Sequence, residues 1–95
     1  MSLAPTLAAA LPERLTMAEA RATLARLQPV FDDAQGDLAL DATALRELDS
    51  AALAVLLHGQ RTLQARGHRL QLVGAPGKLG ELARMYGVAP LLGLD

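Results

Sequence analysis

The chain has 95 residues, of which 52% are apolar and 20% charged, so we expect one small folded domain over residues 1–95 rather than a disordered chain. Aromatic residues make up only 2%, and nine basic residues are matched by ten acidic ones, for a formal net charge of −1. This composition argues against nucleic acid as a partner, because duplex binding needs a basic excess and single-strand binding needs aromatic faces. There is no cysteine, and the two histidines lack a neighbouring ligand pattern, so neither a thiol nucleophile nor a metal site is expected.

The apolar start of the chain lacks the pattern of a secretory signal. The first basic residue is Arg14, Pro5 interrupts the run, and the stretch is much shorter than the roughly 20 residues of a membrane span. We therefore expect a cytoplasmic protein with no direct membrane insertion. Residues 1–6 are interpreted as disordered or, in part, as an expression scar.

The first half of the chain predicts a strand, a helix and a second strand. The first strand is expected over residues 7–11, ahead of Pro12. Thr16 and Glu19 then have the spacing of a capping box, which predicts the start of a helix that Pro29 should end or kink. The second strand is expected over residues 37–41, where the apolar run is typical of a buried strand.

The second half predicts a long helix over residues 51–66, a strand over residues 70–73, and a short helix ended by Gly87. On the short helix, an apolar face is expected at i, i+3, i+4 and i+7, comprising Leu79, Leu82, Ala83 and Tyr86. The apolar tail, residues 88–94, should pack back on the core. Alternating strands and helices are typical of an α/β domain with a largely parallel sheet.

The long helix is apolar at every position from residue 51 to residue 57, AALAVLL. A helix that covers one face of a sheet needs an apolar stripe only about 100° wide. The expected sheet-facing stripe is Ala52, Leu53, Leu56, Gly59, Gln60 and Leu63. The remaining apolar residues of this helix lie outside the stripe. A domain of this size has difficulty burying a helix on all sides, so we interpret these outer residues as a partner-binding surface. Its predicted members are Ala51, Ala54, Leu57, His58 and Arg61; the alternative is that the third helix and the tail bury this excess.

Asp49 and Ser50 open the long helix and allow two interpretations. In the first, Ser50 is an ordinary N-cap that accepts a hydrogen bond from the amide of Leu53. In the second, Ser50 is a phosphorylation switch, with Asp49 beside it, at which a phosphoryl group would add a charge of about −1.5 to −2.

The sequence contains neither the pattern of a serine hydrolase around Ser50 nor a phosphate-binding loop. Ser50 lacks a Gly-x-Ser-x-Gly elbow, and His58 lies about 12 Å away along the same helix, too far to act as its base. The GAPGK stretch at residues 74–78 lacks both the spacing of a phosphate loop and the Ser or Thr that follows its Lys. We expect no enzymatic activity and no cofactor.

Four segments together resemble a STAS domain: LALD at 38–41, LDSAALAVLLH at 48–58, LQLVG at 70–74 and LGEL at 79–82. The resemblance covers roughly residues 7–92. It implies an α/β fold with a small, mostly parallel or mixed sheet and helices packed mainly on one face. The most specific piece is the family's Asp-Ser/Thr-x-Gly-Leu segment, on which Asp49, Ser50 and Leu53 fall, so Ser50 takes the position that anti-sigma-factor antagonists phosphorylate. Ala52 replaces the usual glycine.

Within the family, the segment around Ser50 and His58 is similar to MlaB-like proteins. This implies a non-enzymatic accessory subunit that binds the cytoplasmic ATPase of an ABC transporter for phospholipid trafficking and outer-membrane lipid asymmetry. The alternative is an anti-sigma-factor antagonist whose partner is a serine kinase and which is regulated at Ser50. The same apolar face is also compatible with a homodimer. Family members usually have one more N-terminal strand, which here is either absent or a stub at residues 2–5.

Overall fold

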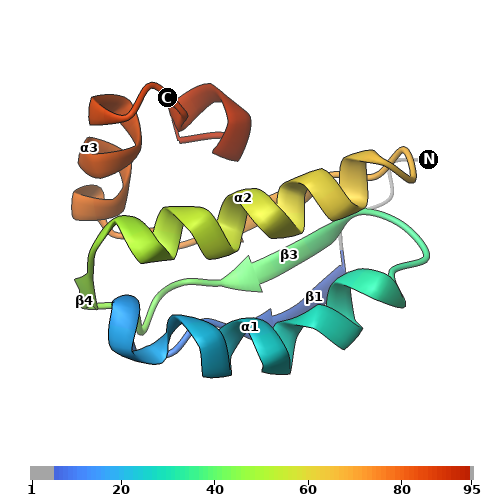
Figure 1. Cartoon of the computed structure of the whole chain (residues 1–95). Helices are drawn as coiled ribbons and strands as arrows, with labels where there is room; N and C mark the ends of the chain where they lie inside the picture. Colours follow the sequence, from blue (N-terminus) through green and yellow to red (C-terminus); the bar gives the residue numbers. More distant parts are fainter. Residues whose placement is uncertain (1–5, 95) are drawn as a thin grey trace.

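Three parallel strands form the sheet of the computed structural model, which describes residues 6–94 (Figure 1). The strands are β1 (Thr6–Ala10), β3 (Leu38–Asp41) and β5 (Leu70–Val73), in the order β1-β3-β5. In the register, Leu40 of the central strand pairs with Ala9 on one side and Leu72 on the other. The three predicted strands are confirmed, each within one residue at either end. The predicted stub at residues 2–5 lies outside the described residues.

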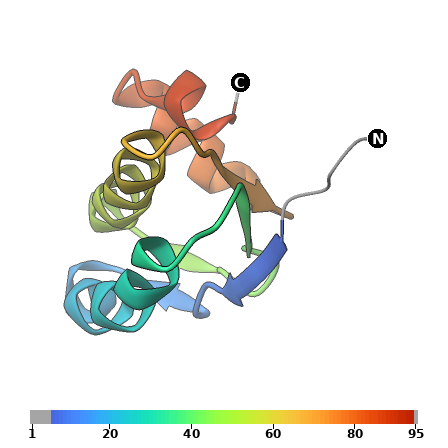
Figure 2. The same cartoon turned by 90° about the vertical axis from the view of Figure 1, so that its right-hand side faces the viewer.

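Helices cover one face of this sheet (Figure 2). The helices α1 (Met17–Asp32) and α2 (Ser50–Gln64) lie side by side against it. The third helix, α3 (Gly77–Met85), lies at the end of the molecule where α2 begins, and a 3-10 helix, η1 (Ala89–Leu92), returns to contact α2 (Figure 1). The predicted α/β fold, with helices mainly on one face, is confirmed, and so is the packing of the tail, since Ala89 and Leu92 are buried.

Pro29 does not end α1, which was one of the two effects expected of it. The helix continues to Asp32, because its last turn is held by groups that the local sequence does not reveal. Phe31 is completely buried, and the guanidinium of Arg66, from the end of α2, donates hydrogen bonds to the carbonyls of Phe31, Asp32 and Ala34. Pro29 itself is exposed, so water can satisfy the carbonyl that its missing N–H leaves free.

The predicted capping box is present at the start of α1. The hydroxyl and the N–H of Thr16 donate to the Glu19 carboxylate over 2.7 and 2.9 Å, and these bonds hold the pKa of Glu19 below its ordinary value of 4.5. The hydroxyl and N–H of Thr43 lower the pKa of Asp41 in the same way, over 2.6 and 2.9 Å. Both carboxylates therefore bind protons less readily in the folded than in the unfolded state.

Acidification should destabilise the protein through these two carboxylates. A carboxylate whose pKa is lower in the folded state than in the unfolded state stabilises the fold when it is ionised. This stabilisation is present above about pH 4.5 and is lost as the pH falls through the pKa values of the folded state. We expect Glu19→Gln to weaken the pH dependence of the urea midpoint between neutral pH and about pH 3. An unchanged pH profile would show that the capping box contributes nothing to acid unfolding.

Candidate functional site

Asp49, rather than Ser50, caps the start of α2. Its Oδ1 accepts from the N–H of Ala51 at 2.8 Å, and its Oδ2 accepts from the N–H of Met17 at 3.1 Å. Ser50 is the first residue of the helix and is exposed. The interpretation of Ser50 as the N-cap is therefore wrong, because its neighbour supplies the longer, charged acceptor. The Ser50 hydroxyl lies at the surface of the molecule.

The same carboxylate joins the first turns of α1 and α2. Both helices follow short strands, β2 (Arg14–Leu15) and β4 (Glu47–Leu48), which pair in parallel with each other. Leu15 and Leu48 are buried, while Arg14 forms an ion pair with Glu47 at 3.4 Å. This small ladder fixes the two helix starts next to each other, so Met17 and Ser50 belong to one surface.

Removing the Asp49 carboxylate should loosen both helix starts. We expect Asp49→Ala to lower the free energy of unfolding by about 1–2 kcal/mol, because one N-cap is worth about 1 kcal/mol and Asp49 serves two N–H groups. Asp49→Asn is the matched control: it keeps one carbonyl acceptor and should lose about half as much. Urea unfolding measures both, and equal stability of all three proteins would contradict the double cap.

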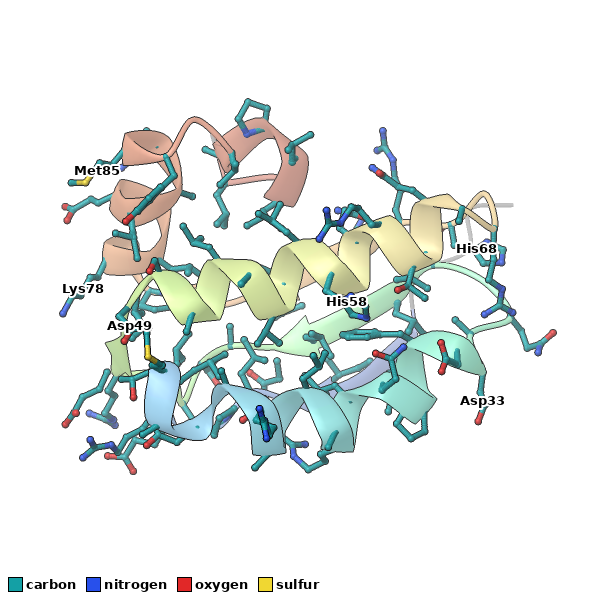
Figure 3. All side chains as sticks on the ribbon, viewed as in Figure 1. Asp33, Asp49, His58, His68, Lys78 and Met85 are labelled. Atoms are coloured by element: carbon teal, nitrogen blue, oxygen red, sulfur yellow. The ribbon has the colours of Figure 1, made fainter. Side chains whose placement is uncertain are left out.

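An open cleft lies between the start of α2 and α3. Its volume is about 460 Å³, and most of its exposed lining is apolar. Figure 3 shows Asp49, Lys78 and Met85 at this same end of the molecule, far from His68 and Asp33. The lining residues are Leu48, Asp49, Ser50, Lys78, Glu81, Leu82, Met85 and Tyr86.

Large apolar side chains are exposed in the lining of this cleft, at Met85 and Tyr86, and at Met17, whose N–H bonds to Asp49 of the lining. Met17 and Met85 are each 79% exposed and Tyr86 is 58% exposed. Tyr86 was expected on the apolar face of the short helix, but it follows α3 as its C-cap residue and is exposed. We call Met17, Ser50, Lys78, Met85 and Tyr86 the Ser50 surface. Exposed apolar groups gathered beside a cleft are typical of a protein-interaction site.

Comparison with known proteins agrees with the fold. The family model described as "Mlab, STAS domain" matches residues 5–93. The chain belongs to the STAS domain family. STAS domains are small protein-interaction modules that are generally non-catalytic. A search of curated proteins found no match.

In this STAS domain, the residues predicted to bind a partner are spread along α2. Ala54 and Arg61 are exposed, whereas Ala51, Leu57 and His58 are half-buried. Leu57 packs against the core, and His58 lies between the helices, where its Nε2 is 2.7 Å from Oε1 of Gln28 in α1. Part of the apolar excess is therefore covered by the protein itself, since Leu57 packs against the core. That any of these residues contacts a partner stays a prediction.

The His58 contact also belongs to a polar chain between α1 and α2. Nε2 of Gln28 donates to the Asp32 carboxylate at 2.9 Å, which turns Oε1 of Gln28 toward His58. Because Oε1 only accepts, Nε2 of His58 must carry the proton of this hydrogen bond. The contact gives His58 a structural role that the sequence pattern did not indicate.

Sequence reasoning missed Met17, Lys78, Met85 and Tyr86 as members of the site. The one available signal was on α3, where Lys78, Glu81 and Met85 share the side opposite the buried Leu79 and Ala83. No helix in the described part of the chain is long and apolar enough to cross a membrane. Among residues 6–94, no group of three His, Cys, Asp or Glu side chains is placed to hold a metal ion.

Proposed function

We propose that this STAS domain is an MlaB-like accessory subunit that binds the cytoplasmic ATPase of a phospholipid-trafficking ABC transporter through the Ser50 surface. The observation that carries the proposal is the open apolar cleft beside Ser50, rimmed by exposed Met85 and Tyr86. Exposed Met and Tyr side chains contribute adaptable apolar contact area and are common in protein interfaces. The MlaB description of the family model supports the choice of partner.

The test is co-purification with the ATPase encoded nearest to this protein. We expect Met85→Glu to reduce recovery of the ATPase about tenfold or more, because a charge would be buried in an apolar contact. Leu91→Glu is the matched control: Leu91 is 52% exposed on η1 and is absent from the cleft lining, so its recovery should equal that of wild type. Equal recovery with Met85→Glu would contradict the Ser50 surface, and no recovery with wild type would contradict the proposed partner.

The exposure of Ser50 favours a second candidate function, that of an anti-sigma-factor antagonist. Its side chain is exposed and Asp49 has taken over the capping, so a kinase has access to the hydroxyl. An anti-sigma-factor antagonist would be phosphorylated there by its serine-kinase partner. Incubation with candidate kinases and ATP, with Ser50→Ala as control, locates the phosphate by mass spectrometry. No modification of Ser50 by any partner kinase would contradict this function.

A further inference from the structure

The first turn of α1 takes one of its hydrogen-bond acceptors from another element. The N–H groups of residues 18–20 donate to the hydroxyl or the carbonyl of Thr16, which is the N-cap of the same helix. The N–H of Met17 donates instead to Oδ2 of Asp49, which lies 32 residues further along the chain. The start of α1 is thus bonded to itself by Thr16 and to the start of α2 by Asp49.

The side chain of Met17 has little packing of its own to fix it. It is 79% exposed, so the backbone decides where this side chain stands. An exposed side chain contributes more to binding when it is already held in place, because the partner then has less to order. Asp49 supplies such a hold through the N–H of Met17, while its Oδ1 caps α2 at the N–H of Ala51.

Asp49 also stands between the two exposed methionines of the Ser50 surface. It lines the cleft together with Met85 of α3, and it bonds Met17 of α1. Figure 3 shows Asp49 at the end of the molecule where α1 begins and where Met85 is exposed. Both methionines are 79% exposed, and exposed methionine offers a partner adaptable apolar contact.

We propose that Asp49 is a positioning residue of the Ser50 surface: its carboxylate holds Met17 beside Ser50, where Met17 contacts the same partner as Met85. This inference rests on the proposed function, because the partner is the ATPase subunit. Asp49 then acts on binding through α1, in addition to its role in capping α2. The start of α1 thereby becomes part of the interface.

Asp49→Asn separates the two bonds of this carboxylate. Asparagine is as good an N-cap as aspartate, and its carbonyl oxygen can still accept from the N–H of Ala51. Its NH2 group then takes the place of Oδ2 and faces the N–H of Met17, which is also a donor. We expect hydrogen exchange to become faster at the Met17 amide and to stay unchanged at the Ala51 amide.

A double-mutant cycle tests the positioning role. Titrating the purified ATPase subunit into the STAS domain, we expect Met17→Ala to weaken binding, and Asp49→Asn to weaken it about three- to tenfold, since the partner must then order Met17. In the Met17→Ala background, Asp49→Asn should cause no further loss, because the side chain that it positions is gone. In the Met85→Ala background, the matched control, it should weaken binding by the same factor as in wild type.

Urea unfolding separates positioning from a general weakening of the fold. Met17→Ala keeps the backbone N–H at residue 17, so Asp49→Asn should shift the urea midpoint equally with and without it. Stability effects that add while binding effects do not are expected only of a positioning residue.

Each other outcome overturns the inference. A loss of binding by Asp49→Asn that persists in the Met17→Ala background would assign Asp49 a direct contact with the partner. Binding by Met17→Ala at wild-type affinity would remove α1 from the interface. Both results leave the proposed function standing, since Met85→Glu tests it separately, whereas no binding of the ATPase by wild type would overturn both.

Discussion

Replacing Gly59 by alanine is expected to destabilise the protein by about 1–3 kcal/mol, although alanine is the better helix former by about 1 kcal/mol. A Cβ atom on Gly59 would lie 2.6 Å from Cζ of Phe31, closer than two carbon atoms approach without displacement. The ring cannot move aside at low cost, because Phe31 is completely buried in the core. The helices α1 and α2 would have to separate at this point.

Gly77→Ala is the matched control for this substitution. Gly77 lies in α3, its backbone is in an ordinary helical conformation, and an added Cβ would meet open space. It should leave stability unchanged or raise it by up to about 1 kcal/mol. A double variant with Phe31→Leu should be less destabilised than the sum of its two single variants, because the smaller side chain makes room. Urea unfolding of Gly59→Ala at wild-type stability would contradict the close approach.

Three contacts tie α1 to α2 along their length. Asp49 bonds the first turns, Phe31 fits against Gly59 toward the other end, and Arg66 holds the carbonyls of the last turn of α1. Their joint effect is to fix the start of α1 relative to the start of α2. The exposed Met17 is therefore held beside Ser50, with its N–H bonded to the Asp49 carboxylate.

The elements of this fold could be predicted because apolar periodicity reports which residues are buried. The run at residues 38–40 is buried throughout, and the long helix begins within one residue of its predicted start. The end of α1 and the cap of α2 were less well predicted, for two different reasons. Arg66, far away in sequence, bonds the last turn of α1, whereas Asp49, the residue before Ser50, supplies the acceptor that caps α2.

The site could be predicted only in part. Ser50 stands out because it matches a family segment. Met17 gives no such signal, and Met85 gives only its place on the side of α3 opposite the buried residues. Leu57 was expected on the surface, but it is half-buried because it packs against the core, which only the tertiary structure shows. The apolar excess at the start of α2 is thus divided between Leu57, which packs against the core, and Ala54, which is exposed.

Replacing Gln60 is the second substitution that we expect to have a large effect on stability. It was predicted to face the sheet and it is buried, yet it does more than fill space. Its Oε1 accepts from the N–H of Leu70 at 2.9 Å, and its Nε2 donates to the carbonyls of Leu70 and Leu91 over 3.2 and 2.9 Å. Leu38 donates instead to the carbonyl of Arg69, so the N–H and C=O of Leu70 point away from β3. The side-chain amide takes the place of a fourth strand at this residue.

Gln60→Leu keeps the side-chain volume but leaves the N–H and C=O of Leu70 without their partner. We expect a loss of about 2–4 kcal/mol in the free energy of unfolding, because each buried unpaired group costs about 1–3 kcal/mol. Hydrogen exchange at the Leu70 amide should also become faster, which separates this loss from a general weakening of the core. Wild-type stability in Gln60→Leu would show that water satisfies these groups equally well.

Gln60→Glu distinguishes the lost donor from the lost acceptor. The introduced carboxylate can still accept from the N–H of Leu70, but when ionised it would face the carbonyls of Leu70 and Leu91, which also only accept. Burial against these carbonyls should raise the folded pKa of the introduced carboxyl group above its unfolded value of about 4.3. The deficit relative to wild type is then largest at neutral pH and shrinks as the pH falls through that raised pKa, because the protonated acid can donate. Wild-type stability of Gln60→Glu at every pH would assign the role of Gln60 to its acceptor alone, and would show that the edge of β5 does not depend on the amide donor.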